Sequence, residues 1–467
     1  MKLKKYCKLL SLFVLIVLIV PIVNVQSQDS FFQKKDDPNN SNFVYDLLII
    51  APQKFTPYLH RLVSHKNMLG ISTILVTTDE IYQHIYWEGR DKAEKIKLFI
   101  KEAKDQWSIQ YVLLVGGRQD QMPVETWWVP IRYTYLNRNY GNLGEPKFLT
   151  DLYFADIYDE YGNFSDWDTN NNNMYGEWPQ NQSALDIPDL IPDVAVGRLP
   201  CRNIRDVIVM VRKIISYETQ KISYSWFKTM VVVAGDTYPE KTEYIDGEVY
   251  TQMGLDMMPT FTPVKLWTSD GSLSNWIDVV RTMNKGSGFI WFSGHGNPSL
   301  WGTHPPHDKK TWIYGLRVRQ MPFLRNRNKL PICIDGSGCF NNMFNVSLTK
   351  SAWTYQFNLP RCWGWALTRE PNGGSIATIG STGFSYESPD ITTGNGGIEW
   401  LDMHFFYQYN LSTTKILGDV WANTVTTFLQ NHTIDWEDTA EDGTALIAKN
   451  VEQWLLIGDP SLKIGGY

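Results

Sequence analysis

Short apolar runs rich in β-branched residues alternate with stretches of helical periodicity along most of the chain. The first strands are predicted at residues 45–51, 71–77 and 111–115, and the helices between them at 57–68 and 91–105. Strands that are apolar throughout are covered on both faces, and strands that alternate with helices are joined by crossovers that make them parallel. The pattern therefore predicts an α/β protein with a mainly parallel sheet.

The same rhythm occurs twice. After an insertion at 116–192 that is rich in aromatic residues, Asn and Asp, a strand at 194–197 and a helix at 204–220 close a first unit. A second unit follows, with predicted strands at 230–234, 264–267, 289–292, 331–334, 375–379 and 454–457 and helices at 273–283 and 416–429. Single cores stop growing at roughly 250 to 300 residues, and this chain has 467. We therefore predict two consecutive subdomains, 43–222 and 223–467, each with a mainly parallel sheet flanked by helices.

The N-terminus has the pattern of an export signal. Lysines at positions 2, 4, 5 and 8 precede an apolar run at 9–20, and small residues follow up to Ser27. This pattern predicts a signal peptide at 1–27, with an uncleaved anchor as the alternative. Residues 28–42 are polar and are predicted to form a linker or a short propeptide. The expected location is secreted or at the cell surface, with no membrane span left after signal removal.

Charge and cysteine content argue against a nucleic-acid-binding protein and against a fold held together by disulfides. The chain has 43 basic and 49 acidic residues, for a net charge of −6, so it lacks the broad positive field that binds nucleic acid. Without Cys7 of the signal, four cysteines remain, too few for a disulfide framework in so long a chain. If Cys339 stays a free thiol, at most one bridge can form, and Cys201 with Cys362 is a candidate pair.

One cysteine and one histidine follow directly after two predicted strands. Strand 289–292 leads into His295 and Gly296, and strand 331–334 leads into Cys339. The carboxyl ends of parallel strands meet at one edge of the sheet, so both side chains are expected there. An imidazole beside a thiol can take its proton and create a nucleophile. The backbone N–H groups of Gly296 and Cys339 would form the oxyanion hole. The alternative is a core cysteine and a structural histidine in a turn.

Four segments resemble the gingipain family of cysteine peptidases in order and spacing. They are residues 286–303 around His295, 329–342 around Cys339, 374–382 and 458–462. The resemblance implies a caspase-like fold and a cysteine endopeptidase that acts on polypeptides through a thioester acyl-enzyme, with no cofactor for catalysis. It also implies a carboxylate that orients the histidine, and Asp236 stands at that point, after strand 230–234. A helix cap is the alternative role for Asp236. The nucleophile loop departs from the family pattern: it is one residue longer, with Gly336 and Gly338 where the family often has bulkier residues.

The resemblance also suggests residues for substrate binding. Relatives that cut after Arg or Lys place an acid in the S1 pocket, and Asp246 is the nearest match in the acidic segment 240–248. Tyr386 falls where the family has an aromatic lid over that pocket, and Trp301 is a further candidate contact. A basic P1 residue is therefore expected, and a solvated acidic helix face is the alternative.

A metal site is predicted in the insertion. Oxygen donors stand at alternate positions in Asp166, Asp168 and Asn170, with Glu177 further on. Calcium takes six to eight oxygen ligands at about 2.4 Å, so this spacing predicts a structural calcium ion. An Asn-rich solvated loop is the alternative. A zinc site built from His304 and His307 with His295 and Cys339 is less favoured, because the two histidines flank a Pro-Pro pair in a loop.

Two other functions remain open at this point. A transpeptidase or ligase of the same fold would use an amine in place of water, and the sequence does not separate it from a hydrolase. A catalytically inactive surface protein stabilised by calcium is the third reading. The intact cysteine, histidine and glycine context argues against it. Nothing in the sequence indicates an oligomeric state.

Overall fold

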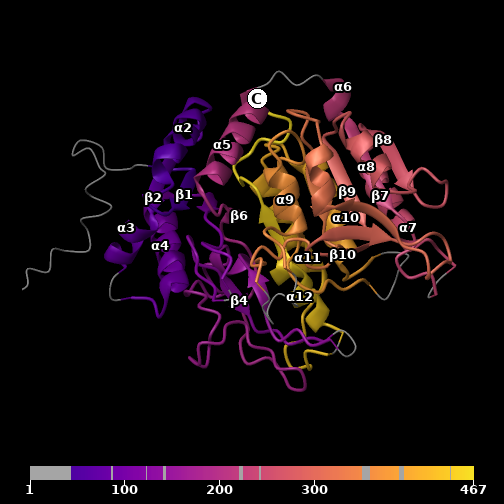
Figure 1. Cartoon of the computed structure of the whole chain (residues 1–467). Coiled ribbons are helices and arrows are strands. Elements are labelled where there is room, and N and C mark those ends of the chain that lie inside the picture. Colours follow the sequence, from indigo (N-terminus) through magenta and orange to yellow (C-terminus); the bar gives the residue numbers. More distant parts are fainter. Residues whose placement is uncertain are drawn as a thin grey trace, which may run out of the picture. The chain divides into compact units, whose positions relative to one another are not determined.

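A ten-stranded sheet forms the centre of the computed structural model, which describes residues 44–85, 88–122, 124–139, 143–219, 224–240, 243–349, 358–388, 394–441 and 443–467 (Figure 1). In spatial order the strands are β2 (Thr73–Thr77), β1 (Leu47–Ala51), β3 (Tyr111–Val115), β6 (Ala195–Leu199), β15 (Trp454–Ile457), β14 (Ala377–Ser381), β13 (Ile332–Asp335), β9 (Phe289–Ser293), β7 (Thr229–Ala234) and β8 (Thr262–Trp267). All neighbours are parallel except β14 and β15. The prediction of a mainly parallel sheet is confirmed.

The two predicted subdomains are the two halves of this one sheet. β15 comes from the end of the chain and pairs with β6 of the first half and β14 of the second. All described residues belong to one compact unit. The predicted boundary after residue 222 falls on residues 220–223, which lie outside the described residues, as do the predicted signal and linker.

Helices pack against the sheet. They are α2 (Thr56–Met68), α3 (Thr78–His84), α4 (Lys92–Trp107), α5 (Ile204–Thr219), α6 (Tyr224–Phe227), α7 (Asp246–Asp256), α8 (Trp276–Met283), α9 (Trp363–Arg369), α10 (Ile398–Leu411), α11 (Leu417–Asn431) and α12 (Ala445–Gln453). In the described part of the chain there are also two 3-10 helices, η1 (Leu152–Phe154) and η2 (Val318–Phe323), and two small antiparallel sheets. One small sheet pairs β4 (Arg132–Thr134) with β5 (Phe148–Thr150), and the other contains β10 (His295–Asn297), β11 (Leu300–Thr303) and β12 (Ile313–Arg317).

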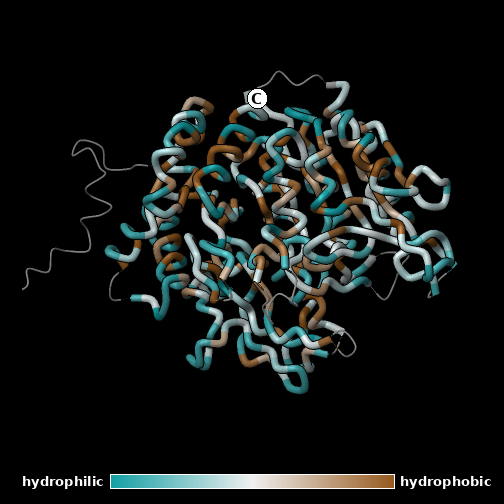
Figure 2. Tube along the Cα trace, viewed as in Figure 1, coloured by the Kyte–Doolittle hydropathy of each residue, from teal (hydrophilic) through white to brown (hydrophobic). Residues whose placement is uncertain are grey.

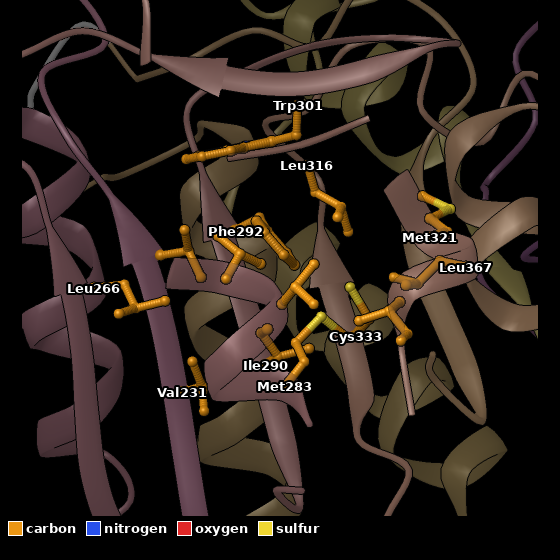
Figure 3. Packing of buried hydrophobic residues seen from close by; sticks show 14 of the residues in the cluster. Val231, Leu266, Met283, Ile290, Phe292, Trp301, Leu316, Met321, Cys333 and Leu367 are labelled. Atoms are coloured by element: carbon orange, nitrogen blue, oxygen red, sulfur yellow. The ribbon is translucent and has the colours of Figure 1, made fainter. Parts of the chain in front are cut away.

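The inner strands of the large sheet are buried because most of their side chains are apolar on both faces, whereas the edge strand β8 is partly exposed. Hydrophobic segments recur along the central strands and helices, whereas the lower loops are mostly hydrophilic (Figure 2). One hydrophobic cluster lies between the strands β7, β9 and β13 and the helices α8 and α9. It includes Val231, Ile290, Phe292 and Cys333 (Figure 3). This packing fixes the strand ends from which the candidate site is built.

The four cysteines of the described residues are free thiols, and Cys201, Cys333 and Cys362 are buried. The candidate bridge between Cys201 and Cys362 is therefore not formed. Burial raises the pKa of both thiols, so they stay protonated and behave as small hydrophobic side chains. Within the described ranges, no helix is both long and apolar enough to cross a bilayer.

Candidate active site

The sheet brings the histidine and cysteine segments side by side. β9 and β13 are parallel neighbours, with Trp291 opposite Ile334, so His295 and Cys339 both follow the same edge of the sheet. Ser337 bridges the two loops: its hydroxyl accepts the N–H of Gly294 at 3.2 Å and donates to the Phe292 carbonyl at 3.4 Å. The predicted position at one edge of the sheet is confirmed.

Two glycines let the backbones of these loops touch. A Cβ added at Gly296 would lie 2.7 Å from both the Cα and the carbonyl carbon of Gly338. Each of these glycines is the sequence neighbour of His295 or Cys339. Any larger residue at position 296 would push the histidine strand away from the nucleophile loop.

If His295 is the base that the sequence predicts, Gly296→Ala should lower kcat on a peptide substrate by roughly 10- to 100-fold, because a displacement of the base near 1 Å costs rate on that scale. Steady-state kinetics with a fluorogenic peptide would measure the change in kcat. Gly443→Ala is the matched control, since a Cβ there meets no atom within 4 Å, and it should keep wild-type rates. Equal activity of both variants would contradict the close contact.

Cys339 is partly exposed at the tip of its loop. Burial raises the pKa of its thiol, against the hydrogen bonds from Ser385, which lower it. The Ser385 backbone N–H lies 3.4 Å from Sγ, and the Ser385 hydroxyl lies 3.3 Å from it. Ser385 stands 46 residues further along the chain, and no sequence signal beyond its place beside Tyr386 points to it. The thiol is therefore protonated at neutral pH and needs a base, while Ser385 can stabilise the thiolate once it forms.

The His295 ring is oriented by a backbone carbonyl. Its Nε2 lies 2.8 Å from the carbonyl oxygen of Thr237. A carbonyl oxygen only accepts, so Nε2 carries the hydrogen and Nδ1 is the nitrogen that can take a proton. This tautomer suits a general base.

Asp236 lies one residue before that carbonyl. Its Oδ2 accepts the backbone N–H of His307 at 2.8 Å, and its own N–H donates to the His304 carbonyl. The other carboxylate oxygen is buried without a hydrogen-bond partner in the described part of the chain. The carboxylate thus ties the 304–307 turn to β7, and a role for it in orienting His295 stays a prediction.

One of the two predicted oxyanion donors, the backbone N–H of Cys339, already has a partner within its own loop. The backbone N–H of Cys339 donates to the Ser337 carbonyl at 3.0 Å. A substrate oxygen would have to take over this hydrogen bond. The role of Gly296 and Cys339 as oxyanion donors stays a prediction.

Asp246 begins α7 and is buried against the same strand ends. Its Oδ1 accepts the backbone N–H groups of Thr237 at 2.6 Å and Gly247 at 2.8 Å. Burial raises the pKa of Asp246 to about 6, although these hydrogen bonds lower it. Thr237 connects the two side chains: its backbone N–H donates to Asp246, and its carbonyl oxygen contacts His295. Asp246 therefore belongs to the same site.

Glu399 is a second acid that the sequence does not single out. It lies at the start of α10 and is almost completely buried. Burial raises its pKa well above the usual range, and the charges of Asp402 and Asp246 raise it further. Neither Asp246 nor Glu399 forms an ion pair with a described basic residue. Asp246 and Glu399 are thus two buried acids close enough to influence each other's charge.

The insertion supports the loop that contains Tyr386. The Tyr386 hydroxyl donates to the Asn139 carbonyl at 3.2 Å, and the Arg138 guanidinium lies 4.8 Å from its ring centroid. Glu145 accepts the backbone N–H of Phe384 and the Lys449 ammonium. Residues far apart in the sequence thus hold the segment beside Cys339, and a role of Tyr386 as a lid stays a prediction.

Comparison with known proteins agrees with this arrangement. The model of peptidase family C25 matches residues 40–465. The chain belongs to peptidase family C25. The gingipain-like resemblance is confirmed, and the family makes the protein a cysteine peptidase.

Solved structures similar to this peptidase show the same fold. The crystal structure of the Arg specific cysteine proteinase gingipain R (RgpB) matches with a TM-score of 0.59 at 18% identity, covering 92% of this chain and 80% of that one. The complex of the RgpB pro- and mature domains from Porphyromonas gingivalis matches with a TM-score of 0.58 at 18% identity, covering 90% and 79%. A search of the curated proteins gives no match. The caspase-like fold implied by the resemblance is confirmed.

Trp301 does not contact substrate in this peptidase. Its indole is fully buried, 5.2 Å from the Phe292 ring and opposite Leu316 on β12 (Figure 3). A Cβ added at Gly315 would lie 2.6 Å from the indole. The prediction of a substrate contact is wrong, because the apolar surface of this strand faces the core and leaves the ring no exposed area.

The predicted calcium donors are already engaged with other groups. Arg90 Nη1 donates to Asp168 at 2.6 Å, and Nη2 lies 3.4 Å from Asp166. Glu177 accepts the Asn170 amide at 3.4 Å. Among the residues with described positions, no group of three or more His, Cys, Asp or Glu is arranged to hold a metal. With Arg90 on two of the acids, the donors do not fit the ion in this arrangement, and calcium stays a prediction from the sequence.

Proposed function

We propose that this cysteine peptidase is an endopeptidase in which Cys339 is the nucleophile and His295 its base. The contact between Gly296 and Gly338 carries the proposal, because it joins the two loops at the residues next to the reacting pair. The hydrogen bond from Nε2 to Thr237 adds to it by leaving Nδ1 as the basic nitrogen.

The proposed reaction has two steps. Nδ1 of His295 takes the thiol proton while the sulfur of Cys339 attacks the peptide carbonyl carbon. The carbon–nitrogen bond then breaks, the imidazole returns the proton to the leaving amine, and a thioester remains. Water, deprotonated by the same imidazole, hydrolyses the thioester and frees the thiol.

We further propose that the enzyme prefers a basic residue at P1. Asp246 supports this, because a buried carboxylate without a cationic partner gains one when an Arg or Lys side chain enters. Glu399 lies within electrostatic range of Asp246; burial favours its neutral form, and an entering cation would favour its ionised form. A guanidinium has five N–H donors and can bind two carboxylates at once.

Covalent labelling tests the assignment of the pair. A peptidyl acyloxymethyl ketone with Arg at P1 is expected to add one inhibitor mass, which peptide mapping should locate at Cys339. His295→Ala should slow labelling by at least about 100-fold, since the thiol then loses its base. Labelling of another cysteine, or unchanged labelling in His295→Ala, would refute the pair. An inactive surface protein would show no labelling at all.

A further inference from the structure

Aromatic rings surround the candidate base on one side. The Trp312 ring centroid lies 5.5 Å from that of His295, and the Tyr238 ring meets the imidazole edge-on at 5.4 Å. Trp312 also packs on the buried His304 ring at 3.9 Å. With 43% of its surface exposed, it is the most exposed tryptophan in the described part of the chain. An apolar ring therefore remains open to solvent directly beside the base.

The chemistry of the proposed reaction determines which part of the substrate lies next to the Trp312 ring. The imidazole must return its proton to the leaving amine, so that amine lies within hydrogen-bond reach of His295. The residue attached to it, P1′, then lies among the groups that flank the imidazole. Large indole rings beside a backbone path are typical binding surfaces for apolar and aromatic side chains.

We propose that Trp312 forms a binding site for the leaving side of the substrate and selects an aromatic or large apolar residue at P1′. This inference rests on the proposed function, since it takes His295 as the base. Trp301, the tryptophan expected to contact substrate, lies in the core, and Trp312 supplies an exposed indole beside the site.

Tyr314 extends the same surface. Trp312 immediately precedes β12 and Tyr314 belongs to it, so the two stand on one face of the strand, with ring planes 9° apart and centroids 6.2 Å apart. In an extended peptide, side chains two residues apart are about 6.4 to 6.8 Å from each other. The ring spacing thus matches P1′ and P3′ of an extended substrate. The Arg317 guanidinium, 4.1 Å from the Tyr314 ring centroid, supports the far end.

Internally quenched peptides that differ only at P1′ test this site. All would have Arg at P1, with Phe, Leu, Gly or Asp at P1′. We expect the wild type to cleave the Phe peptide about tenfold faster than the Gly peptide in kcat/KM, the scale of one aromatic contact. Trp312→Ala should bring that ratio close to one by slowing the Phe peptide, with the Gly peptide changed less than about twofold. Trp312→Phe should retain most of the preference.

Phe323→Ala is the matched control. Phe323 is another exposed aromatic residue, packed on Trp276 of α8, and its loss should leave the P1′ ratio unchanged. If Trp312→Ala slows all four peptides by one factor and keeps the Phe to Gly ratio, the ring is structural and the proposal is wrong. A wild type with no P1′ preference also overturns it. Failure of the proposed function is distinct, because then no peptide is cleaved and Cys339 is not labelled.

Discussion

Replacing Cys339 with serine is expected to lower kcat/KM for peptide hydrolysis by a factor on the order of 10⁴ or more, and His295→Ala by a comparable factor. The physical reason is the raised pKa of the Cys339 thiol, which burial keeps protonated at neutral pH. Without the imidazole almost no thiolate is present, so loss of the base costs nearly as much as loss of the sulfur. Steady-state kinetics with an Arg peptide would measure both variants.

Rescue by alkaline pH distinguishes the two roles. Below the pKa of the thiol, the thiolate fraction rises about tenfold for each unit of pH. His295→Ala should therefore regain activity as the pH rises, whereas Cys339→Ser should stay inactive across the range. Absence of rescue in His295→Ala would show that the ring does more than take the proton.

A second cysteine provides the control. Cys362 is a buried free thiol at the N-cap of α9, a position where serine is favoured. Cys362→Ser should fold and keep wild-type kcat/KM. If it lost as much activity as Cys339→Ser, the loss could not be assigned to the nucleophile.

The strands and the reacting pair could be predicted because their signals are local. Buried parallel strands are apolar on both faces, so β3 and β15 were predicted with the bounds that the structure shows. His295 and Cys339 follow two such strands directly, and parallel strands end at one edge. That β15 joins both halves into a single sheet was not predictable, because strand order depends on contacts between distant segments.

The rest of the site depends on residues that only folding brings together. Ser385 meets Cys339, and Glu145 of the insertion reaches Phe384, without any pattern in either stretch. β11 and β12 are short and mixed in polarity, so the sequence does not show that Trp301 faces the core while Trp312 faces solvent. The resemblance therefore suggested Trp301 as a substrate contact, although its indole is fully buried.

Asp246→Asn is expected to lower kcat/KM for an Arg peptide by roughly 100- to 1,000-fold, the cost of leaving a buried cation without its partner. A peptide with a neutral residue at P1 should change less than about threefold. The amide oxygen of Asn can still accept the N–H of Thr237 and so keep the carbonyl that orients His295. Glu243→Gln, at an exposed position of the same segment, should change neither rate. Equal losses on both peptides would instead show that Asp246 positions Thr237.

The pH dependence of this preference follows from the pKa of Asp246, which burial raises to about 6. The carboxylate is ionised above that pH and neutral below it, and only the ionised form attracts a basic P1 side chain. The ratio of kcat/KM for Arg over neutral peptides should therefore be constant above about pH 7 and fall about tenfold per unit below pH 6. A group that acts on both peptides alike cancels in this ratio. A carboxyl with a pKa of about 6 loses its charge between pH 7 and pH 4.5. A ratio that stays constant over this range in the wild type would therefore show that Asp246 is not the acid that selects the P1 residue.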